Sequence, residues 1–139
     1  MAKGRNFKRP PNKSSKRIQV KEVEPPIDYN LQKPIFSFKY MAYQEPGCIS
    51  MCQRDKKSLI IDTFLRFSQL TWKQIVSLPR QAGFEKIPFH RFRVSLPKKL
   101  TPEVTLLVAR YDGDGGRLAG FRDKDIYHVV LVGKDLYSH

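Results

Sequence analysis

The 139-residue chain has few acidic residues, two cysteines and no long hydrophobic run. No apolar stretch approaches the roughly 18–20 residues that cross a bilayer, and the basic N-terminus is not followed by the apolar segment of a secretory signal. Cys48 and Cys52 have no further cysteine or histidine at a spacing typical of zinc sites. We therefore expect two buried, reduced thiols, no metal or other cofactor, no membrane partner and a cytoplasmic location. Nucleotide-binding glycine motifs are also missing.

Positive charge, in contrast, is in large excess. Lysine and arginine total 26 against 13 acidic residues, which gives a net charge of +13 and a pI near 10.0. Such self-repulsion opposes a compact state, and a polyanion that neutralises it is the usual reason for it. Nucleic acid is the commonest polyanion partner, and an anionic membrane surface is the next. A basic protein without a polyanion ligand is the remaining alternative.

Much of this charge lies at the N-terminus. Eight of the 26 basic residues precede the first acid, Glu22, in a stretch with neither helical nor strand periodicity. Such a stretch buries too little apolar surface to offset its ordering entropy. We expect residues 1–30 to be a disordered basic arm and residues 31–139 to form one domain. The arm residues predicted to contact RNA phosphates are Arg5, Lys8, Arg9, Lys13, Lys16 and Arg17. A spacer without specific contacts is the alternative.

Two helices are predicted in the middle of the chain. Over Lys56–Ser68, apolar residues recur at three- and four-residue spacing and form one stripe. A second helix begins after Thr71, because Thr71 and Gln74 form a Thr-x-x-Gln capping box, and Pro79 ends it.

Strands are predicted on both sides of these helices. Two precede them, and an antiparallel meander follows, with turns at 112–116 and 123–125. The predicted strands are Ile35–Met41, Cys48–Cys52, Phe89–Leu96, Val104–Tyr111, Arg117–Arg122 and Ile126–Val132. This order predicts an α+β fold with two helices packed on one face of a small antiparallel sheet.

The predicted hairpins bring positive charges together. Arg110 is expected opposite Arg117, which in turn lies opposite Leu131, and Arg122 is expected beside His128 on one face. Like charges that face each other in a sheet need an anion or an acid between them. A phosphate would suit the two guanidinium groups, but an aspartate of the 112–116 turn would serve equally well.

Two further features fit RNA. Histidine is a residue type suited to acid–base work, so His128 is a candidate for such work on a ribose 2′-hydroxyl, although a buried histidine with a backbone partner is the commoner case. His90, Arg91 and Arg93 surround Phe92 in a basic patch of the kind that holds single strands by stacking and phosphate contacts.

The stretch from Ala109 to His139 resembles the C-terminal half of the RelE-type toxins, small basic endoribonucleases of bacterial toxin–antitoxin systems. In that family a strand ends in arginine, a hairpin leads to a second arginine, and a hydrophobic strand ends in Val-Gly-His/Lys-Arg, with a tyrosine a few residues further on. Arg110, Arg117, Val132-Gly133-Lys134 and Tyr137 occupy these places. Apolar residues stand here where many members carry basic ones in the strand before the hairpin.

The resemblance implies metal-independent cleavage of RNA, in many members of mRNA at the ribosome. Arg117 would hold the scissile phosphate, Lys134 would support it, and Tyr137 would transfer a proton, with His128 or His139 as further candidates. Two alternatives stay open. One is a non-catalytic protein that binds RNA or the ribosome, and the other is a protein-interaction module bound by an acidic, antitoxin-like partner.

Overall fold

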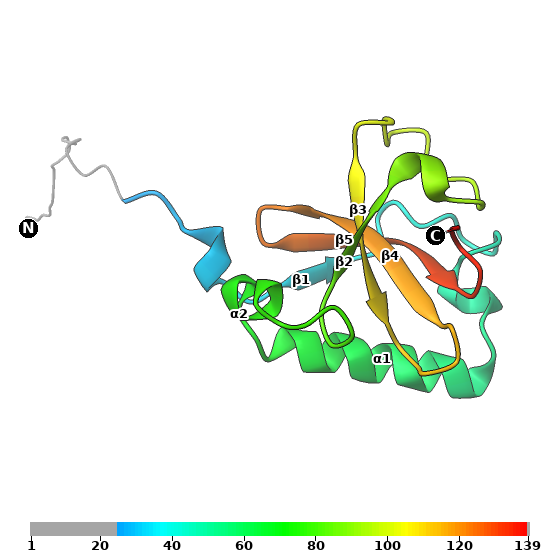
Figure 1. Cartoon of the computed structure of the whole chain (residues 1–139), viewed down its shortest axis with the longest axis horizontal. Coiled ribbons are helices and arrows are strands. Elements are labelled where there is room, and N and C mark those ends of the chain that lie inside the picture. Colours follow the sequence, from blue (N-terminus) through cyan, green and yellow to red (C-terminus); the bar gives the residue numbers. More distant parts are fainter. Residues whose placement is uncertain (1–24, 139) are drawn as a thin grey trace, which may run out of the picture.

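The computed structural model describes residues 25–138, so the six basic residues assigned to the arm lie outside the described part. The fold is α+β, with a five-stranded sheet and two helices, as the element order predicts (Figure 1). In chain order the elements are η1 (Tyr29–Leu31), β1 (Ile35–Ser37), η2 (Ile49–Met51), α1 (Arg54–Ser68), α2 (Trp72–Val76), β2 (Glu85–Pro88), η3 (Phe89–Arg91), β3 (Thr105–Arg110), β4 (Arg117–Asp123) and β5 (Ile126–Gly133), where η denotes a 3-10 helix.

The sheet has the strand order β1-β5-β4-β3-β2. Strands β2 to β5 form antiparallel pairs, which confirms the predicted meander for β3, β4 and β5. Strand β2 was not predicted, because it precedes the expected strand Phe89–Leu96. Strand β1, however, pairs with β5 in parallel, with Ile35 beside Ile126. Parallel neighbours need a long crossover connection, and the chain between Ser37 and Ile126 provides it. The sheet is therefore mixed and larger than expected.

Helix α1 packs on one face of the sheet and confirms the predicted apolar stripe. Its buried side chains Ile60, Phe64 and Phe67 form a core with Trp72 of α2 and with residues of β3, β4 and β5. The predicted capping box starts α2. The Thr71 N–H donates to Gln74 Oε1 at 2.8 Å, and the Gln74 N–H donates to the Thr71 hydroxyl at 3.2 Å.

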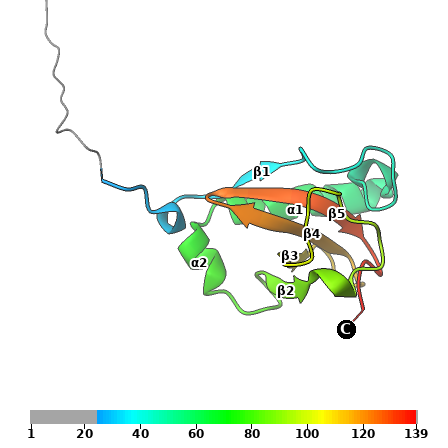
Figure 2. The same ribbon diagram turned by 90° about the horizontal axis from the view of Figure 1, so that it is seen from above.

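No α-helix among the described residues covers the opposite face. There the buried strand residues pack against Leu100, Leu136 and Tyr137, and against partly buried side chains of the segment after β2. Figure 2 shows the C-terminal end on the side of β2, away from α1. The strand residues of this second core are Ile87, Leu106, Val108, Ala119, Val130 and Leu131.

The expected register between β4 and β5 is wrong. Arg117 pairs with Gly133 instead of Leu131. Two shifts of one residue each cause the difference: the turn that joins β4 to β5 is one residue shorter than expected, and a bulge between Ala119 and Gly120 places one additional residue in β5. A slip of one residue turns each side chain to the other face of the sheet. Tyr127 of β5 therefore lies on the same face of the sheet as Ala109 and Leu118, toward α1.

Two predicted strands are also wrong. Cys48–Cys52 contains the 3-10 helix η2, which follows a turn at Gly47, where φ is +93°. Both cysteines are free thiols; Cys48 is buried and Cys52 is half-buried. Most of Phe89–Leu96 is irregular after η3, because its two phenylalanines are three residues apart and both turn inward against the second core.

Candidate nucleic-acid interface

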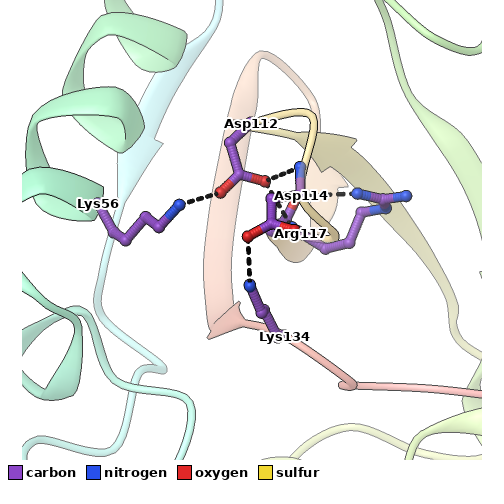
Figure 3. A network of polar contacts seen from close by, with 6 residues as sticks. Lys56, Asp112, Asp114, Arg117 and Lys134 are labelled. Carbon is purple, nitrogen blue, oxygen red and sulfur yellow. Dashed lines mark hydrogen bonds and ion pairs between the residues drawn. The ribbon is translucent and has the colours of Figure 1, made fainter.

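Asp112 organises the turn between β3 and β4 (Figure 3). Its Oδ1 accepts hydrogen bonds from the N–H groups of Asp114 at 3.0 Å and Gly116 at 2.7 Å, and its Oδ2 accepts one from Lys56 Nζ at 2.8 Å. Position 116 requires glycine, because a Cβ there would lie 2.4 Å from the Tyr111 ring. Asp112 thus closes the turn that precedes Arg117 and ties it to α1.

The two acids of this turn are held in their charged forms by lysines. Burial raises the pKa of the Asp112 carboxyl, but the hydrogen bonds from Lys56, Gly116 and Asp114 outweigh burial and leave the pKa below its usual value. Lys134 Nζ donates to Asp114 Oδ2 at 2.7 Å and lowers the pKa of that carboxyl as well. Both aspartates are therefore occupied by lysines.

In the described part of the chain the arginine pair consequently forms no ion pair with an acid. Arg110 lies directly opposite Arg117, which confirms the predicted register of this hairpin. Within residues 25–138 neither arginine forms an ion pair, and Arg110 Nε is buried without a hydrogen-bond partner. Arg117 Nη1 donates only to the carbonyl oxygen of Gly116, at 3.0 Å. An aspartate from the turn, the alternative explanation of the pair, is thus excluded for the described residues.

The C-terminal residues bring a third arginine to this place. After β5 the chain reverses through Gly133, at φ +147°, and Asp135, at φ +55°. Two backbone hydrogen bonds, of 2.8 and 3.0 Å, then join residues 136–138 to residues 91–93. This pairing sets Arg93 beside the end of the hairpin, although the two segments are more than 40 residues apart in sequence.

A pocket of about 220 Å³ lies between these segments. Its volume corresponds to that of about seven water molecules in the liquid. Arg93 and Arg117 line it, and strand alternation puts Arg110 on the same face of the sheet. The lining residues are Arg93, Gly115, Arg117, Asp135, Leu136, Tyr137 and Ser138. We refer to it as the arginine pocket.

Tyr137 and Arg117 both line the arginine pocket. The side chain is 7% exposed, its ring lies 5.5 Å from that of Phe92, and its hydroxyl oxygen is shielded from solvent. Asp135, which the sequence analysis did not single out, adds one negative charge to the lining. The pocket thus carries two arginines, one carboxylate and one tyrosine.

The other expected catalytic residues lie elsewhere. Lys134 is engaged with Asp114 and lines a neighbouring cavity. His128 is 8% exposed between the rings of Tyr40 and Phe121, and its Nδ1 is buried without a hydrogen-bond partner. His139 lies outside the described residues.

The predicted grouping of Arg122 with His128 is wrong. In the observed register Arg122 pairs with Tyr127, and His128 pairs with Phe121. The Arg122 guanidinium lies 4.3 Å from the centre of the Trp72 ring on the α1 side and donates to the Lys124 carbonyl oxygen and Asn30 Oδ1. These contacts fasten η1 and α2 to the sheet.

The basic patch around Phe92 is only partly presented to solvent. His90, Arg91 and Arg93 are exposed, whereas Phe92 packs into the second core. The patch therefore offers charge without an exposed aromatic ring of its own.

Residues 25–138 contain no group of histidine, cysteine or acidic side chains that could hold a metal ion. None of the helices in this range is long and apolar enough to span a bilayer.

Comparison of the chain with models of known protein families, with curated proteins and with solved structures finds no match. The likeness to RelE-type toxins therefore stays a prediction from short motifs. The function has to be inferred from the geometry of the described residues.

Proposed function

We propose that this protein binds RNA and holds a backbone phosphate in the arginine pocket. The observation that carries the proposal is the position of Arg110 and Arg117, which face each other while the nearby aspartates are bound to lysines. The arrangement is unfavourable in the free protein and becomes favourable when an anion is bound. A guanidinium fork matches the oxygens of a phosphate in charge and shape.

The net charge of +13 favours a polyanion over a single small anion, because it extends well beyond the pocket. Binding of fluorescent single-stranded RNA at low ionic strength, compared with binding of vesicles that contain anionic lipid, tests the class of polyanion. We expect binding of RNA with a steep salt dependence and weak binding of vesicles. Vesicle binding without RNA binding would contradict the proposal.

Cleavage of RNA is the second candidate function. It is favoured by the presence of Arg117 and Tyr137 in the same pocket, where cationic groups would stabilise the scissile phosphate and a phenol would take part in proton transfer. Because the Tyr137 hydroxyl is shielded from solvent, the C-terminal residues have to move before it reaches a substrate. On this proposal the protein acts in the cytoplasm on mRNA at the ribosome, and an acidic, antitoxin-like protein would compete for the same cationic face.

The cleavage test is incubation of RNA with the purified protein in EDTA, with and without ribosomes. We expect cleavage by the wild type, a large loss in Arg117→Ala, and full activity in Arg80→Ala, an exposed arginine paired with Glu85. Tyr137→Phe keeps the ring packing and is expected to lose cleavage but retain RNA binding. Intact RNA under all conditions would remove the enzymatic candidate and leave RNA binding as the function.

A further inference from the structure

Arg93 lines a second, larger cavity as well as the arginine pocket. This cavity has a volume of about 550 Å³ and lies on the face of the sheet that no described α-helix covers. Its size falls within the range of small-molecule sites, about 300–1,000 Å³. Because one residue belongs to both cavities, a ligand that reaches from one to the other passes Arg93.

The lining of the larger cavity is mainly apolar and includes a few polar and charged residues. Val130 and Leu131 of β5 belong to it, and Leu96 and Pro97 are contributed by the segment after η3. Tyr40 adds a half-buried aromatic ring, which lies 5.6 Å from the ring of Phe121. The charged residues that line the cavity are Glu45, Arg93 and Lys98.

Cations continue along this side of the molecule. Lys39 Nζ and Lys99 Nζ lie 5.5 and 5.7 Å from the centre of the Tyr40 ring, so two exposed ammonium groups accompany the aromatic residue. Single-stranded nucleic acids are held by this combination, in which rings and apolar walls receive the bases while cations hold the phosphates.

We propose that the larger cavity receives a nucleobase of the RNA strand whose phosphate lies in the arginine pocket, with Arg93 between the two. The inference rests on the proposed function and adds a base site to it. Glu45 is the specificity-determining residue, because its carboxylate accepts hydrogen bonds from an exocyclic amino group. Adenine, cytosine and guanine carry such a group and uracil lacks it, so uracil is disfavoured.

Ala42 offers a way to block the cavity without disturbing the core, since it is exposed and lines the cavity. Ala42→Trp places an indole in the space meant for the base. Val76→Trp is the matched control, because Val76 is 72% exposed on α2, on the opposite side of the sheet. Both variants of the full chain are compared with the wild type by fluorescence anisotropy.

The probes are an RNA oligonucleotide of mixed sequence and an abasic ribose-phosphate oligomer of the same length, which has the same phosphates but no bases. We expect the wild type and Val76→Trp to bind RNA about 5- to 100-fold more tightly than the abasic oligomer. Ala42→Trp should bind the two oligomers alike. If Ala42→Trp still prefers RNA over the abasic oligomer as strongly as the wild type does, the base site is overturned. Binding of both oligomers in that case would still support the phosphate site. If the wild type binds neither oligomer, the proposed function and the base site both fail.

A second variant tests the specificity. The wild type should bind oligoadenylate and oligocytidylate more tightly than oligouridylate of equal length, and Glu45→Ala should remove this difference. Glu45 is exposed, so its side chain is not needed for the core. Equal binding of the three oligomers by the wild type, or an unchanged difference in Glu45→Ala, would contradict the role of Glu45.

Discussion

Arg110 and Arg117 face each other across β3 and β4, and no acid within residues 25–138 lies between them. Two neighbouring aspartates are present, but Lys56 binds one and Lys134 binds the other. The hairpin therefore keeps two like charges side by side at a cost to its own stability. A residue pair that destabilises the free protein is expected where the charge is needed for a ligand.

Arg110→Met should change the stability of the protein and its affinity for RNA in opposite directions. The substitution keeps an apolar stem, removes a like charge opposite Arg117 and removes an Nε that is buried without a partner. We expect the free protein to become more stable by about 0.2–1 kcal/mol, the size of a cross-strand pair effect, and to bind RNA more weakly. Thermal unfolding and anisotropy measure the two effects. Arg80→Met, the control, should leave RNA binding unchanged, and a loss of stability in Arg110→Met would contradict the prediction.

Asp112 should make the stability of the protein depend on pH. Its pKa is lower in the folded state than in the unfolded chain, so its contribution is complete above the unfolded pKa and is lost as the pH falls through the folded pKa. Asp112→Asn should cost about 1.5–3 kcal/mol at pH 7, the usual size for a hydrogen bond to a charged group, since the side chain is 7% exposed.

The difference between Asp112→Asn and the wild type should shrink once the pH falls below the usual aspartate pKa of about 3.9. Denaturant unfolding at several pH values measures it. Asp114→Asn is the control: its side chain is 77% exposed, so it should have a smaller effect at every pH. A difference for Asp112→Asn that stays constant down to low pH would show that its carboxylate charge does not matter.

Asp135 is expected to weaken the proposed binding of phosphate in the arginine pocket, because this negatively charged residue belongs to the lining. Asp135→Asn removes this charge and retains the left-handed backbone conformation at φ +55°, which asparagine adopts readily. We expect a several-fold increase in RNA affinity. Asp62→Asn on α1 removes the same charge at an exposed position on the far side of the sheet and should change RNA affinity less. An equal increase in RNA affinity in the two variants would mean that RNA binding depends on the net charge of the protein and not on the position of Asp135.

Gly120 should be irreplaceable at the β4–β5 bulge. A Cβ at this position would lie 2.1 Å from the His128 carbonyl oxygen, so the two strands approach too closely for any side chain. We expect Gly120→Ala to destabilise the protein by about 1–3 kcal/mol or more, the range for overpacked cores. Gly113→Ala is the matched control, because a Cβ there meets no atom within 4 Å, and it should be nearly neutral. Comparable stability of the two variants would contradict the bulge geometry.

Local sequence signals predict much of this fold. The Thr71–Gln74 capping box, the apolar stripe of α1 and the Asp-Gly turn that sets Arg110 opposite Arg117 each depend on residues close in sequence. Gly120 inside a strand is itself a local signal for a bulge, and a bulge shifts the register of β5.

The remaining features depend on contacts between distant segments. The parallel pairing of β1 with β5 has no local signature, and neither has the ion pair between Lys56 and Asp112. The basic neighbours of Arg93 predict that it contacts RNA. Its place beside Arg117 follows only from the reversal of the chain after Gly133, which the sequence pattern does not indicate.

The salt dependence of RNA binding tests the arginine pocket most directly. Affinity for a single-stranded RNA is measured by anisotropy at a series of salt concentrations for the wild type, for Arg93→Ala/Arg117→Ala, and for Arg54→Ala/Arg80→Ala, which removes two exposed arginines outside the pocket. Loss of one phosphate contact lowers the slope of log affinity against log salt by about 0.7. We predict that the pocket variant loses at least this much slope and about 10-fold or more in affinity, while the control double variant stays closer to the wild type. Identical slopes and affinities for the wild type and Arg93→Ala/Arg117→Ala would contradict the proposal that this pocket holds RNA phosphate.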